Sequence, residues 1–142
     1  MGKLLCLDYG EKRVGVAVTD SGAQMAFPRA ALFKTTRRDF FVRLGVLLQK
    51  EAPSAIVLGL PLRQDGSDSL TTRQVRNFAL SLQRAFALPV YFMDETLSSA
   101  EAEMLLRESE QKAYMRDGRV DSLAAVKILE SFLNLAPEKR LL

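Results

Sequence analysis

Acidic residues stand at the ends of several apolar segments of this sequence. Asp8 directly follows the apolar residues 4–7, Asp94 and Glu95 directly follow "VYFM", and Asp121 begins "DSLAAV". The carboxyl ends of parallel strands meet at one edge of an open α/β sheet, so acids placed there can converge on one spot. Grouped carboxylate oxygens suit hard divalent cations, chiefly Mg²⁺ or Mn²⁺. A site of this kind can activate water for attack on a phosphodiester.

The absence of histidine narrows the chemistry further. The 142 residues include no histidine and a single cysteine, Cys6, which lies inside the first apolar run. Catalytic triads with histidine and metal sites with histidine ligands are therefore excluded. A lone cysteine forms neither an internal disulfide nor a Cys-x-x-Cys site. Any catalysis must come from carboxylates, Lys or Arg, hydroxyl groups, or a metal held by oxygen atoms.

Each of these acids also has an ordinary structural explanation. Asp8 could open the turn "DYGEK", Asp94 and Glu95 could cap a following helix, and Asp121 could be a helix N-cap in competition with Ser122. Against this, an unpaired carboxylate directly after four apolar residues costs burial free energy. The interpretation as a site depends on the joint placement of the acids.

The periodicity of apolar residues predicts the elements that position these acids. Strand patterns, of which the third is interrupted by Pro28, occupy residues 4–7, 13–20, 23–35, 55–61 and 89–95. Helical spacing follows in residues 40–48, 75–86, 98–110 and 123–133. The order is β-β-β-α-β-α-β-α-α. Antiparallel strands come first, and the alternating units that follow favour parallel pairing.

The overall composition is that of a globular protein. Hydrophobic residues make up 48% and charged residues 26% of the sequence. The length of 142 residues suggests one domain over residues 1–142. No apolar run approaches the ~18 residues of a membrane span or forms a signal peptide, so we expect the protein in the cytoplasm. Residues 1–50 hold nine Lys and Arg against four Asp and Glu. This surplus suits a polyanion, although a solvated basic surface also explains it.

Five segments together resemble the YqgF/RuvX family of small bacterial proteins, over nearly the whole chain. They are "LLCLDYGEKRVGVAVTD", "IVLGLPLRQDGSDS", "TTRQVRNFALSL", "VYFMDETLSSAEAE" and "VDSLAAVKILESFL". The resemblance implies an α/β ribonuclease H-like fold, with a five-stranded mixed sheet of order 3-2-1-4-5, an antiparallel second strand and flanking helices. The family resembles Holliday junction resolvases of the RuvC type. It is described as nucleases that process the 5′ end of precursor 16S ribosomal RNA, and Holliday junction resolution is its older assignment.

The resemblance also implies site residues. Asp8 matches the catalytic aspartate of the first strand, and Asp121 matches the carboxylate of the last helix. The fourth strand ends in "GLP", without the acid that related nucleases have there, so the "DET" motif after the fifth strand is the candidate for the middle carboxylate. Strands 1 and 5 would lie about 10 Å apart, which favours Glu95 over the shorter Asp94. We therefore expect Asp8, Glu95 and Asp121 to be catalytic and to bind Mg²⁺ or Mn²⁺.

One departure from the family concerns an arginine. The family usually reads "DERLTS" where this chain reads "DETLSS", so Thr96 stands in place of that arginine. The candidates for contacts with phosphate are Arg13, Arg63, Arg73 and Arg76. Arg73 and Arg76 lie about one turn apart at the start of a predicted helix, and helix N-termini bind phosphate. A solvated helical face explains the same pair.

We expect a metal-dependent nuclease that acts on structured RNA first and on branched DNA second. Two other functions stay open. The first loop also looks like the phosphate loop of actin and sugar kinases, but those proteins need two lobes. A non-catalytic nucleic-acid-binding module would keep the fold and lose cleavage. Because RuvC-like resolvases act as dimers, a homodimer is an open option, but no segment identifies its face.

Overall fold

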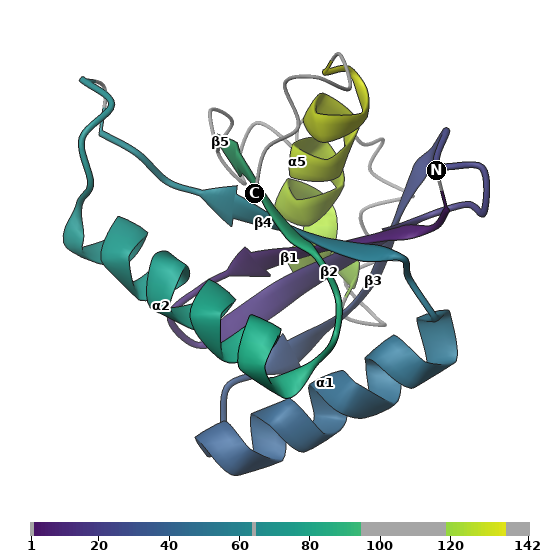
Figure 1. The fold of residues 1–142 in the computed structure, drawn as a ribbon, viewed down its shortest axis with the longest axis horizontal. Coiled ribbons are helices and arrows are strands. Elements are labelled where there is room, and N and C mark those ends of the chain that lie inside the picture. Colours follow the sequence, from purple (N-terminus) through teal and green to yellow (C-terminus); the bar gives the residue numbers. More distant parts are fainter. Residues whose placement is uncertain (1, 64, 95–118, 136–142) are drawn as a thin grey trace.

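The computed structural model describes residues 2–63, 65–94 and 119–135, and its centre is a five-stranded sheet (Figure 1). The strands are β1 (Leu4–Tyr9), β2 (Arg13–Thr19), β3 (Ala26–Phe33), β4 (Ala55–Leu60) and β5 (Val90–Asp94). Their order in the sheet is β3-β2-β1-β4-β5. β2 pairs antiparallel with β1 and β3, whereas β1, β4 and β5 pair in parallel. The expected fold class is confirmed.

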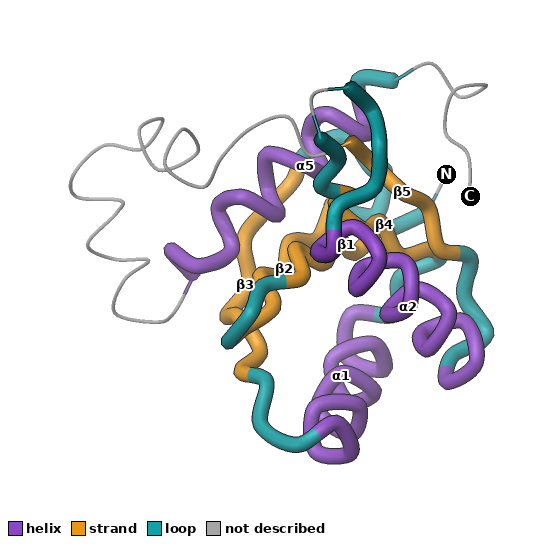
Figure 2. Tube along the Cα trace, turned by 90° about the vertical axis from the view of Figure 1, so that its left-hand side faces the viewer, coloured by secondary structure: helices purple, strands orange, loops and turns teal. Residues whose placement is uncertain are grey.

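Helices cover both faces of this sheet (Figure 2). One face carries α1 (Arg37–Glu51) and α2 (Leu70–Ala85), and the other carries α5 (Leu123–Leu133), which is preceded by the short 3₁₀ helix η1 (Arg119–Ser122). The helix expected at 98–110 lies outside the described residues. No helix of the described part is long and apolar enough to cross a membrane.

The third strand differs from its expected form. Pro28 does not interrupt it, since β3 is continuous and Pro28 pairs with Ala17 of β2. The expected interruption was wrong because β3 is an edge strand, and an edge position needs no backbone donor on its outer side.

The alternation of side chains along β1 divides the core into two parts. Leu5 and Leu7 pack with α1 and α2 in the larger cluster, and Cys6 packs with α5 in the smaller one. The same alternation directs the next two residues of β1 to opposite faces. Tyr9 joins the larger cluster, so Asp8 belongs to the α5 face.

Candidate active site

Asp8 lies inside β1 and not in the turn that follows it. It pairs with Gly15 of β2 across the antiparallel ladder. The turn is closed by backbone groups, with the N–H of Gly10 donating to the carbonyl of Arg13 over 3.1 Å. The structure therefore does not support the explanation of Asp8 as the residue that opens the turn. Asp8 is half-buried at the C-terminal end of the central strand.

Gly15 brings the backbone of η1 beside Asp8. A Cβ atom on Gly15 would lie 2.7 Å from the backbone oxygen of Asp121 and 3.5 Å from Cβ of Asp8. The first of these distances is too short for any real side chain, so η1 can lie against β2 only because residue 15 has none. Asp8 and Asp121, which are 113 positions apart in the printed numbering, thus border one glycine.

Ser122 fixes η1 to the sheet through hydrogen bonds. Its hydroxyl accepts from the backbone N–H of Val16 over 2.9 Å and donates to the carbonyl of Arg29 over 2.6 Å. These groups flank a bulge, since Val14 pairs with Leu32 and Val16 with Arg29. The hydroxyl takes the place of a direct ladder bond between β2 and β3.

The N-cap of α5 is Ser122, although its hydroxyl makes no capping hydrogen bond. The alternative in which Asp121 caps this helix is therefore wrong, because Asp121 lies one residue earlier, in η1. Sequence reasoning considered Ser122 only as a cap. The sequence signals for its contact with the sheet were a serine next to an acid and the glycine that interrupts the valines of β2.

Arg13 is the ionic partner of Asp121. Its Nη1 donates to Oδ2 of Asp121 over 2.8 Å, and its guanidinium lies 5.3 Å from the centre of the Phe33 ring. Both side chains are partly exposed. The contact leaves further guanidinium N–H groups for another acceptor. Arg13, predicted to contact phosphate, is thus beside one of the predicted acids.

Asp94 lies on the wrong face to join this pair. Tyr91 and Met93 of β5 pack on the α5 side, and Phe92 packs on the side of α1 and α2. Alternation therefore directs Asp94 to the face opposite Asp8. Glu95 lies outside the described residues.

The described residues contain no group of three His, Cys, Asp or Glu side chains that could hold a metal ion. Two members of the predicted set, Asp8 and Asp121, border Gly15, and both side chains offer only oxygen ligands.

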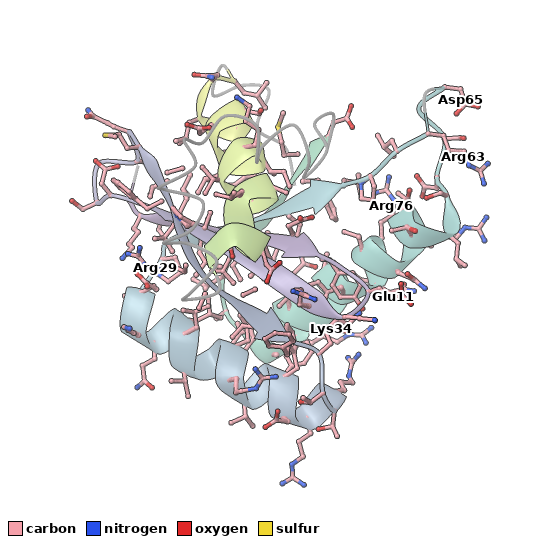
Figure 3. The ribbon with its side chains drawn as sticks, turned by 180° about the vertical axis from the view of Figure 1, so that it is seen from behind. Glu11, Arg29, Lys34, Arg63, Asp65 and Arg76 are labelled. Carbon is pink, nitrogen blue, oxygen red and sulfur yellow. The ribbon has the colours of Figure 1, made fainter. Side chains whose placement is uncertain are left out.

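The other predicted arginines flank the loop between β4 and α2. Figure 3 shows Arg63 and Asp65 at the tip of this loop and Arg76 on α2. Since β4 is parallel to β1, the loop leaves the same edge of the sheet at which Asp8 lies. The side chains of Arg63 and Arg73 are exposed, and no hydrogen bond or ion pair holds either within the described part of the chain.

Arg76, in contrast, is held by Asp68. Its Nε and Nη2 donate to the two carboxylate oxygens of Asp68 over 2.8 and 3.1 Å. The hydrogen bonds from Arg76 hold the pKa of the Asp68 carboxyl below its ordinary value. The pair is therefore charged at neutral pH, and Arg76 would have to share its guanidinium to contact a phosphate.

Comparisons with known proteins agree over nearly the whole chain. The model of the RuvX family, described as Holliday junction resolvase, matches residues 2–135. A protein of Nitratidesulfovibrio vulgaris (strain Miyazaki F) is 53% identical over 138 residues, covering 97% of this chain and 96% of its own. A protein of Oleidesulfovibrio alaskensis is 48% identical over 139 residues, with 98% and 96% covered. Both carry the name "Putative pre-16S rRNA nuclease".

Among solved structures, the fold is similar to that of the Fowlpox virus Holliday junction resolvase. The TM-score is 0.55 at 12% identity, with 92% of this chain and 97% of that chain covered. The same resolvase in complex with Holliday junction DNA gives a TM-score of 0.54 at 14% identity, with 93% and 99% covered. At this level of identity the likeness concerns the fold.

Proposed function

The chain belongs to the RuvX family, and on this premise we propose that it is a nuclease that hydrolyses phosphodiester bonds of structured RNA, in the 5′-end processing of precursor 16S ribosomal RNA. The named relatives support this substrate. The observation that carries the proposal is that Asp8 and the backbone of Asp121 both lie beside Gly15. Carboxylates that are partly removed from water cost free energy unless they are paired or bind a cation.

The donor set fits a hard divalent cation, Mg²⁺ or Mn²⁺. Within the described residues, Asp8 and Asp121 offer carboxylate oxygens as ligands, and this sequence has no histidine to compete. Asp8, Asp121 and Glu95 would hold the ion, and Asp94 is disfavoured by its face of the sheet. When bound, the ion supplies an activated water and stabilises charge on the phosphate oxygens.

The side chains of this site have separate roles. Arg13 holds Asp121 by one oxygen, Oδ2, and places a positive charge beside the candidate site. Its remaining N–H groups would orient the substrate phosphate. Arg63 and Arg73, at the same edge of the sheet, would contact phosphates farther along the substrate.

Branched DNA is the second candidate substrate. It is favoured by the description of the family model and by the fold shared with a viral Holliday junction resolvase. A four-way junction needs two cuts, so a homodimer would belong to this second function. The experiment must also distinguish these two nuclease functions from a third possibility, a module that binds nucleic acid without cleaving it.

The first test compares the wild type with Asp8→Asn in Mg²⁺ and in Mn²⁺. The labelled substrates are a 5′ segment of precursor 16S ribosomal RNA and a four-way DNA junction. We expect cleavage of the RNA, reduced at least ~100-fold in the variant. Glu130→Gln, an exposed acid on α5, is the matched control and should cleave like the wild type. Cleavage of the junction alone would replace RNA by DNA, and binding without any cleavage would overturn the nuclease.

A matched pair of variants tests the middle acid. Glu95→Gln should abolish metal-dependent cleavage, and Asp94→Asn should leave at least about half of it, because Asp94 belongs to the other face of the sheet. Full activity of Glu95→Gln would remove Glu95 from the site. Loss of activity in Asp94→Asn alone would exchange the two roles.

A further inference from the structure

A groove lies between α1 and α2, on the face of the sheet opposite α5. Figure 1 shows that α2 ends against α1 while the N-terminal ends of the two helices lie apart. Three adjoining hollows occupy this angle, because neighbouring hollows share lining residues, Tyr9 and Lys34 in one case and Arg37 and Phe41 in the other. We call it the α1–α2 groove, and its main lining residues are Tyr9, Lys34, Arg37, Phe41, Ser81 and Arg84.

Positive charge predominates in this groove. Lys34, Arg37, Arg38 and Arg84 line it, against one acid, Glu11, among the described residues. Figure 3 shows Lys34 and Glu11 on the same side of the molecule as Arg76, with Arg29 on the far side. Four cations against one acid, in a hollow between two helices, would bind a polyanion.

Two of these cations stand where helix stability disfavours them. Arg37 and Arg38 are the first two residues of α1, which follow the N-cap Thr36. The N-terminus of a helix carries partial positive charge, which repels cations and attracts anions. Thr36 accepts from the N–H groups of Asp39 and Phe40. An anion bound in the groove would therefore meet the N–H groups of Arg37 and Arg38 and the two guanidinium groups.

Aromatic rings hold two of the cations in place. Arg37 lies 5.2 Å from the centre of the Phe41 ring, and its Nη2 donates to the hydroxyl of Ser81 over 2.7 Å. Lys34 has its Nζ 4.0 Å from the centre of the Tyr9 ring. Cations that are held before binding lose less conformational entropy when a phosphate arrives. A positively charged groove that follows the backbone is typical of proteins that bind single strands.

The groove begins next to the candidate active site. Tyr9 directly follows Asp8 in β1, and the two side chains belong to opposite faces of the sheet. A strand bound at Asp8 could therefore pass over the end of β1 and continue between the helices. Tyr9 and Phe41 already pack on Phe78, so the groove would contact a strand through its phosphates and not through its bases.

We propose that the α1–α2 groove binds a single-stranded segment of RNA through its phosphates, with Lys34, Arg37, Arg38 and Arg84 as the contacts. That this segment flanks the cleaved bond rests on the proposed function, whereas the binding itself does not. The groove would then guide the substrate to the carboxylates from the other face of the sheet.

The test measures binding without cleavage. Asp8→Asn protein in a chelator is titrated against a labelled single-stranded RNA of about 12 nucleotides, and affinity is followed by fluorescence anisotropy at several salt concentrations. In that background, Arg38→Ala with Arg84→Ala should weaken binding about tenfold and reduce the salt slope by about 1.4. Both arginines are exposed, so the variant should unfold at the same temperature as its parent. Arg38→Lys with Arg84→Lys should keep most of the affinity.

Lys50→Ala with Lys127→Ala is the charge-matched control away from the groove and should change affinity by less than about twofold. Equal weakening by both double variants, or none by the groove variant, would overturn the proposal. Equal weakening for an RNA duplex would overturn its single-stranded character. If the wild type cleaves nothing while the groove variant loses binding, the proposed nuclease fails and the groove stands. Normal cleavage and normal binding by the groove variant would overturn the groove proposal and leave the proposed nuclease standing.

Discussion

The two faces of the sheet are built from side chains of different size. The face of α1 and α2 is filled by large residues such as Leu44, Phe78 and Leu82. The face of α5 has small residues in its centre, with Cys6 and Ala17 buried and Gly15 against η1. Large side chains therefore separate α1 and α2 from the sheet, whereas on the other face the backbone of η1 lies against the backbone of β2 at Gly15.

This difference separates stability from chemistry. The larger cluster buries leucines, valines and phenylalanines, which supply most of the hydrophobic free energy. The candidate active site depends on a missing side chain and on the hydrogen bonds of Ser122. A substitution can therefore lower stability without lowering activity, or lower activity more than stability. The following three variants test this separation.

The largest effect on stability is expected from Leu82→Ala. Leu82 is fully buried on α2, and its truncation should lower the free energy of unfolding by about 2–5 kcal/mol, because a cavity replaces packed atoms. Urea denaturation measures the change. At temperatures where the variant is folded, nuclease activity per molecule should equal that of the wild type.

The matched control is Leu80→Ala on the same helix, where the side chain is 50% exposed and the change should be within ~0.5 kcal/mol. Loss of activity in folded Leu82→Ala protein would show that the two faces are not separable.

Gly15→Ala should have a smaller effect on stability and a larger one on activity. The added methyl group would collide with the backbone of Asp121, so we expect a loss of about 1–3 kcal/mol in the free energy of unfolding. Cleavage should fall about 100-fold, because a displacement of about 1 Å at a catalytic group costs that much. Denaturation and single-turnover kinetics provide both numbers.

Gly22→Ala serves as the control, since a Cβ there would have no neighbour closer than 3.7 Å. Wild-type cleavage by Gly15→Ala would contradict the role of the glycine in positioning Asp121.

The smallest of the three effects concerns Glu51, at the end of α1. Its buried carboxylate accepts from Lys3 over 2.6 Å and from Nε of Arg29 over 3.0 Å. Burial raises the pKa of Glu51, but the hydrogen bonds and charges of Lys3 and Arg29 outweigh burial and lower it. The carboxylate therefore stabilises the fold above about pH 4.5, and this contribution is lost as the pH falls through the lower pKa of the folded state.

Glu51→Gln should accordingly be about 1–2 kcal/mol less stable than the wild type at neutral pH. The difference should shrink when denaturation is repeated in acid, below the folded pKa. Glu130→Gln, at an exposed position, should follow the wild type within ~0.5 kcal/mol throughout. A difference for Glu51→Gln that is independent of pH would exclude the ionic contribution.

Local pattern was sufficient for much of the fold. Valine alternation predicted β2, helical spacing predicted α1 and α5, and the acid after the first apolar run was found at the end of β1. The order of the strands came from the family resemblance. These features depend on neighbouring residues or on motifs, which the sequence displays directly.

Other features depend on contacts between distant residues. The hydrogen bond from Val16 to Ser122 spans 106 positions, and no local pattern indicates it. The continuity of β3 through Pro28 follows from its place at the sheet edge. The face of the sheet to which Asp94 belongs is set by the pairing of β5 with β4. Each required the assembled sheet.

The hydrogen bonds of Ser122 with Val16 and Arg29 also limit when this part of the sheet can be completed during synthesis. β2 and β3 follow one another in sequence and pair antiparallel, yet the hydrogen bonds at their bulge are completed by a residue near the other end of the chain. Contacts of such separation form late, because loop closure is costly. The first strands leave the ribosome before residue 122 has been made. If Asp8 and Asp121 form the proposed site, that site is complete only after residue 122 has been made, so the growing chain would not yet carry it while the first strands leave the ribosome.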